Sequence, residues 1–143
     1  MKKIMIIFIC LVIIIISIFG VKYINYKAEK NKIKQENLEY EVCLNRQILG
    51  TELTTFINKA VDSNEKNKVL KDGQGFYIKN DINSVEIEIK ITDNDSTYKM
   101  ETLYDGGMLN FVDYYNSIYF ECTKIEYNKL GKVSYLLFEQ KTN

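Results

Sequence analysis

The sequence has 143 residues with 19 basic and 19 acidic side chains, so its formal net charge is zero. It contains no histidine, which excludes Ser–His and Cys–His nucleophile arrangements and removes the usual protein ligand of metals. A neutral chain with a single arginine, Arg46, is poorly suited to neutralising phosphates, so we expect no nucleic-acid partner.

An apolar run from Ile4 to Val21, preceded by two lysines, dominates the beginning of the chain. At about 1.5 Å per residue, a helix of this length spans roughly 27 Å, close to the hydrocarbon thickness of a bilayer. The alternative is a cleaved signal peptide, whose apolar region is usually about 7–15 residues long and ends at small residues. This run is longer and has Ile18 where a small residue is wanted. We expect residues 1–21 to form a retained transmembrane anchor, with the lipid bilayer as partner.

The lysines around the run favour opposite orientations. Lys2 and Lys3 directly before an apolar run are typical of a signal anchor whose amino end stays in the cytoplasm. The other flank carries more lysines: Lys22, Lys27, Lys30, Lys32 and Lys34. We expect a single-pass cell-membrane protein with its amino end inside and its carboxyl-terminal domain extracytoplasmic, and the reverse orientation stays open.

Residues 22–49 are good helix formers without an internal Gly or Pro and with sparse apolar positions. They predict a helical stalk that continues the anchor, with a buried face growing toward Val42. A heptad-like track interrupted by polar residues leaves self-association as an alternative to a solvated stalk. That track is Val21, Ile24, Ala28, Asn31, Gln35, Leu38 and Val42.

The stretch after Gly50 predicts an amphipathic helix from Thr51, as N-cap, to Val61. Its apolar residues recur at spacings of three and four: Leu49, Leu53, Phe56, Ile57, Ala60 and Val61. Whether Gly50 kinks one long helix or separates two is open from the sequence.

The remaining residues change to a period of two. Alternation predicts strands over residues 85–91, 98–104, 118–127 and 133–140, with a short helix over 108–116. Short connections predict antiparallel neighbours. We therefore expect residues 50–143 to form an α+β domain, in which the amphipathic helix packs on a mostly antiparallel sheet of about four strands.

Three short motifs invite a chemical interpretation, and each has a simpler one. Asp93 and Asp95 resemble the start of a calcium loop but lack the glycine that follows in an EF-hand, so we interpret them as a turn. Glu86 and Glu88 share one strand face, which indicates a solvated sheet surface. Asp105-Gly106-Gly107 could approach an anion through backbone N–H groups, but Asp105 repels one. We predict no catalytic, cofactor-binding or metal-binding residues, and no cofactor.

Tyrosines are concentrated in the second half of the chain. They suit either strand and core packing or a contact surface. They are Tyr98, Tyr104, Tyr114, Tyr115, Tyr119 and Tyr127.

Two cysteines, Cys43 and Cys122, lie outside the apolar run. We expect two unlinked thiols, because free cysteines are common as small buried apolar residues. A bridge is the alternative, and it requires Cα atoms within about 7 Å of each other.

The segments Ile48–Ala60, Cys122–Tyr127 and Leu137–Gln140 resemble small single-pass proteins of low-GC Gram-positive bacteria. The layout of an apolar amino-terminal helix, a helical extension and an antiparallel sheet is also similar to that of type IV pilins and pseudopilins. The prepilin cleavage signature and the early glutamate of those proteins are not found around this apolar run. The resemblance implies an envelope structural or interaction role, pilin-like or secretion-accessory, with itself or another envelope protein as partner. A membrane-tethered module that binds a small ligand or an envelope partner is the alternative, and we do not expect an enzyme.

Overall fold

The computed structural model describes residues 2–93 and 95–142. Its helices are α1 (Lys2–Glu41), α2 (Gly50–Lys66), α3 (Met100–Gly106) and α4 (Met108–Tyr115). Its strands are β1 (Gln47–Leu49), β2 (Glu86–Ile91), β3 (Ser96–Lys99), β4 (Tyr119–Tyr127) and β5 (Val133–Gln140). The chain forms two compact units, one that ends at Gln35 and one that begins at Glu36.

The first unit is the larger part of α1. Its side chains over residues 2–32 are all exposed, including the whole apolar run. Among the described residues, α1 is the one helix long and apolar enough to cross a membrane by its length and composition.

The second unit begins within the last turns of α1, where Asn37 and Tyr40 are buried. The predicted growth of a buried face is therefore confirmed, but Val42 is exposed. The helix ends at Glu41 and the chain becomes a strand at Gln47, so helical stalk structure does not extend to residue 49. Pairing of β1 with β4 holds this segment extended, which overrides its helix propensity.

The predicted α+β fold is confirmed, with a five-stranded sheet in the order β1-β4-β5-β2-β3. Three of its pairings are antiparallel (β1–β4, β4–β5 and β2–β3), and β2 runs parallel to β5. The β4–β5 turn contains Gly131 at a φ of 76°, a left-handed conformation that favours glycine. The additional strand relative to the expected four is β1.

The predicted strand over residues 98–104 is wrong in its second half. The strand ends at Lys99, and Met100 begins α3. Met100 and Leu103 are both buried. Residues three apart face the same side in a helix but opposite sides in a strand, so the helix is the conformation that buries both. The predicted helix over 108–116 is confirmed as α4.

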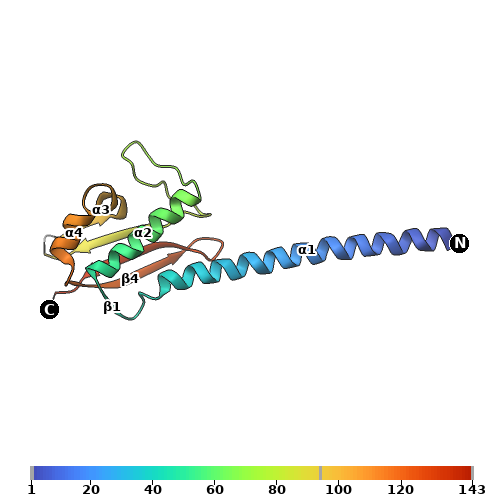
Figure 1. Ribbon diagram of the computed structural model, residues 1–143, viewed down its shortest axis with the longest axis horizontal. Coiled ribbons are helices and arrows are strands. Elements are labelled where there is room, and N and C mark those ends of the chain that lie inside the picture. Colours follow the sequence, from blue (N-terminus) through green and yellow to red (C-terminus); the bar gives the residue numbers. More distant parts are fainter. Residues whose placement is uncertain (1, 94, 143) are drawn as a thin grey trace. The chain divides into compact units, whose positions relative to one another are not determined.

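The amphipathic helix α2 lies along one face of the sheet (Figure 1), as predicted. Its Phe56 ring is 5.5 Å from the Phe138 ring of β5, measured between centroids. The start of the helix differs from the prediction: Leu49, not Thr51, is the N-cap, because β1 leads directly into α2. The Leu49 N–H donates to Glu52 Oε2 at 3.2 Å, which supplies one of the cap bonds.

Gly50 is the first residue of α2 and directly follows β1, so it does not kink one long helix, which answers the question left open by the sequence. A Cβ at this position would lie 2.0 Å from the backbone carbonyl oxygen of Tyr115. Glycine therefore permits the close approach of α2 to the end of α4.

We expect Phe56→Ala to reduce the free energy of unfolding by about 3–5 kcal/mol, because the ring is only 5% exposed and packs on Phe138. The measurement is denaturant unfolding of residues 36–143, with Leu38→Ala at an exposed position as the matched control. A loss below about 1 kcal/mol for Phe56→Ala would contradict the packing of α2 on the sheet.

Candidate functional site

An open groove of about 520 Å³ lies between α3, α4 and the β2–β3 hairpin. Its surface is mostly apolar and aromatic, with a few polar side chains. The lining residues are Ile91, Tyr98, Thr102, Leu103, Gly106, Gly107, Asn110, Phe111, Tyr114 and Tyr115. Such a surface suits an apolar or aromatic group.

Phe111 fixes the α4 wall of this groove. Its ring stacks on Tyr115 at 5.0 Å and lies 5.9 Å from Phe120 of β4, both measured between centroids. Its backbone N–H donates to the carbonyl of Gly107, the N-cap of α4, at 2.7 Å. The buried aromatic contact thus holds a short helix against the sheet, and the opposite face of that helix is left to solvent.

Two large side chains project from α4 into solvent. Leu109 is 81% exposed, and Tyr114 at the groove is 79% exposed. Exposed apolar side chains beside a concave aromatic surface are typical of contact sites.

The six tyrosines singled out in the sequence separate into two groups. Tyr98, Tyr114 and Tyr115 line the groove, whereas Tyr104 on α3 and Tyr119 and Tyr127 on β4 are not part of its lining. Burial raises the pKa of the Tyr115 phenol above its usual value. The alternative that tyrosines form a contact surface therefore concerns Tyr98, Tyr114 and Tyr115, which the fold brings together at the groove.

The other sequence candidates occupy structural positions. Asp93 Oδ2 accepts a hydrogen bond from Gln140 Nε2 at 2.7 Å, in the β2–β3 turn. Asp95 continues this turn with a φ of 49°, and residue 94 lies outside the described residues. No group of residues within the described ranges 2–93 and 95–142 has the composition of a metal site.

The two glutamates of β2 pair with side chains from neighbouring strands. Glu88 Oε2 accepts a bond from the Tyr135 hydroxyl at 2.7 Å, and Glu86 lies 3.9 Å from Lys99 Nζ. Burial raises the pKa of the Glu86 carboxyl, and Lys99 opposes this shift.

Asp105 lies at the end of α3, 3.9 Å from Lys71 Nζ. The two glycines after it line the groove. Gly106 and Gly107 therefore contribute to the wall of the groove. Nothing in this arrangement indicates an anion as the ligand.

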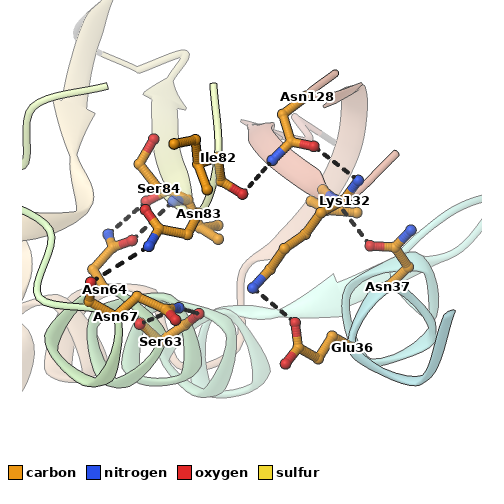
Figure 2. A network of polar contacts seen from close by, with 12 residues as sticks. Glu36, Asn37, Ser63, Asn64, Asn67, Ile82, Asn83, Ser84, Asn128 and Lys132 are labelled. Carbon is orange, nitrogen blue, oxygen red and sulfur yellow. Dashed lines mark hydrogen bonds and ion pairs between the residues drawn. The ribbon is translucent and has the colours of Figure 1, made fainter. Parts of the chain in front are cut away.

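A second group of polar residues connects separate segments of the folded unit (Figure 2). Asn64, fully buried on α2, donates to the Val85 carbonyl at 2.7 Å and accepts from the Val85 N–H at 2.8 Å. Asn37, near the end of α1, similarly donates to the Gly131 carbonyl and accepts from the Val133 N–H. Each side-chain amide therefore satisfies backbone N–H and C=O groups that have no partner strand or helix at that point.

The same network continues around the β4–β5 turn (Figure 2). Asn128 donates to the Ile82 carbonyl at 2.9 Å and accepts from the Lys132 N–H at 3.0 Å. Lys132 Nζ lies 2.7 Å from Glu36 Oε2. These groups are engaged with one another, so the network has a structural role and the groove is the better candidate for binding.

Glu101 was not recognised from the sequence. Its carboxylate is 4% exposed, and Oε1 accepts the Tyr77 N–H at 2.9 Å. Among the described residues, neither Glu101 Oε2 nor the Tyr77 hydroxyl has a hydrogen-bond partner. Burial raises the pKa of Tyr77 to about 12. Glu101 faces the core because this segment is the helix α3. The sequence predicted a strand here, and that prediction gave no reason to expect a buried Glu101.

No protein-family model, curated protein or solved structure matches this chain.

We expect Asn64→Ala to reduce the free energy of unfolding by about 2–4 kcal/mol, because it leaves both backbone groups of Val85 unpaired. Asn83→Ala is the matched control, since the Asn83 amide makes only a 3.4 Å bond to the Asn67 carbonyl. Its expected cost is below about 1 kcal/mol. Equal losses in denaturant unfolding of the two variants would contradict the structural role assigned to Asn64.

Proposed function

We propose that this protein is a membrane-anchored interaction protein of the cell envelope, pilin-like or secretion-accessory. The observation that carries the proposal is the exposed apolar segment Ile4–Val21 at the start of α1, on a chain that also has a folded α+β unit. Bulky apolar side chains fully surrounding a helix are unfavourable in water and favourable in lipid.

The proposed orientation has the amino end in the cytoplasm and the folded unit outside. Lys2 and Lys3 at the start of the apolar run support it. The partner is a second copy of the chain or another envelope protein, and nucleic acid is not part of the proposal. Catalysis is not part of it either, since the sequence has no histidine.

The surface we assign to partner contact is the exposed side of α4, at Leu109 and Tyr114. Tyr114 lines the aromatic groove and is 79% exposed, and Leu109 on the same short helix is 81% exposed, which supports contact with an apolar segment of a protein partner. The edge strands are less suited to pairing, because β1 has three residues and β3 has four. Contact through a sheet edge or along α1 stays a prediction.

A membrane-tethered module for a small ligand is the second candidate. The groove of about 520 Å³ favours it, since this volume falls within the range of small-molecule sites.

We expect the anchor to be retained in the mature protein. The measurement is the intact mass of protein extracted from membranes of cells that express the full chain. Retention predicts the mass of the complete sequence, because the run has Ile18 where a cleavage site needs a small residue. A mature form that starts near Val21 or Lys22 would overturn the anchored interpretation.

Photo-crosslinking in intact cells tests the contact surface. We expect a benzoylphenylalanine at Leu109 or Tyr114 to give adducts of discrete mass, identified by mass spectrometry as a second copy or one envelope protein. The same probe at Asp81, on an exposed turn away from α4, is the control. Adducts at Asp81 alone, or at none of the three positions, would count against the proposed surface. Further probes placed between Lys27 and Gln47 test the stalk, and adducts confined to those positions would assign the contact to the stalk instead.

A further inference from the structure

Two thiols lie in the core where α1 joins the sheet. Cys43 is in the turn between α1 and β1, and Cys122 is on β4. Pairing of β1 with β4, with Ile48 opposite Phe120, brings this turn back over β4. Cys43 is 0% exposed and Cys122 is 7% exposed, and both belong to one apolar cluster. Residues far apart in the sequence are therefore neighbours in the folded unit.

The two thiols are close enough to affect each other's titration: Cys122 raises the pKa of Cys43, and Cys43 lowers the pKa of Cys122. The Cys122 thiol in turn reaches the Lys124 carbonyl oxygen, at 3.5 Å. Both thiols are free in this structure. Because both thiols are buried in the same cluster where the turn after α1 returns over β4, they are the pair of cysteines that the fold brings together.

We propose that Cys43 and Cys122 form an intramolecular disulfide that joins the turn after α1 to β4 when the folded unit faces an oxidising compartment. The inference rests on the extracytoplasmic orientation in the proposed function. It departs from the expectation from sequence, which favoured two unlinked cysteines because it held no information on their separation.

The reaction is a thiol–disulfide exchange with a disulfide-bearing oxidant, either an envelope oxidoreductase or oxidised glutathione. The Cys122 thiolate attacks one sulfur of that disulfide, so the oxidant's S–S bond breaks and one thiol leaves. The Cys43 sulfur, after losing its proton, then attacks Cys122 Sγ in the mixed disulfide and releases the second thiol. Two protein thiols are oxidised, and the oxidant's disulfide is reduced to two thiols.

The order of attack follows from the interaction between the two thiols. It lowers the pKa of Cys122 and raises that of Cys43, so Cys122 is the thiolate that forms first. Cys122 is also the more exposed of the two. Both are well buried, so the reaction takes place during folding or through local opening of the β1 segment.

The bridge would close a loop that contains β1, α2, β2, β3, α3 and α4. A long closed loop restricts the unfolded chain, which raises stability. It would also hold the end of α1 to the sheet covalently, in addition to the hydrogen bonds of Asn37.

The test uses the full chain purified in detergent and folded as judged by circular dichroism. After incubation with mixed reduced and oxidised glutathione, free thiols are trapped with N-ethylmaleimide and the peptides are mapped without reduction. We expect a linked Cys43–Cys122 peptide, and maleimide on Cys10 alone. Cys10→Ser is the control variant and should retain the linked peptide, whereas Cys43→Ser should abolish it. Folded protein that carries maleimide on all three cysteines, or a bridge that involves Cys10, would overturn the inference.

A second arm separates this inference from the proposed orientation. Intact cells are treated with N-ethylmaleimide before lysis, and the linked peptide is sought in the membrane fraction. A bridge in both arms supports the disulfide and the outward-facing domain. If the purified protein forms the bridge but the thiols are free in cells, the result supports the pairing of Cys43 with Cys122 and counts against the proposed orientation. Failure in the purified protein rejects the disulfide whatever the orientation.

Discussion

Coverage of one sheet face by α2 is the constraint on which the folded unit depends. Alternation along β2 places Ile87, Ile89 and Ile91 on the same face of the sheet. Exposure of this apolar face to water would cost much of the stability of the folded unit. The apolar stripe of α2 covers it, with Phe56 against Phe138. This packing also explains Gly50, because only a residue without Cβ lets the start of α2 lie against the Tyr115 backbone.

The groove and the cysteine pair are consequences of this arrangement. Once α2 covers the sheet, α3 and α4 must occupy the remaining core surface, and Phe111 fills it from α4. The outer side of α4 then stays open beside Tyr98 and Tyr114. At β1, the return of the chain toward β4 brings Cys43 to Cys122. The proposed contact surface therefore results from the packing of α4, and the proposed disulfide results from the pairing of β1 with β4.

Much of the fold could be predicted because its signals are local. The strand over 133–140 was predicted at its observed bounds, and α2 was predicted from the spacing of Leu53, Phe56 and Ile57. The errors fall where tertiary contacts override local preference. β1 is extended because β4 pairs with it, and Met100 begins a helix because both it and Leu103 reach the core. Of the candidate site, the sequence indicated the tyrosines but not which of them converge.

The apolar run, the amphipathic period of α2 and the alternation of the strands are properties of neighbouring residues, so the sequence alone determined the membrane-spanning candidate and the α+β class. Contacts between distant residues depend on register and topology, which no local pattern contains. The parallel pairing of β2 with β5, the burial of Glu101 and the meeting of Cys43 with Cys122 are of this kind. Only the tertiary structure decided them, because each requires the chain to close loops of many residues before the two partners meet.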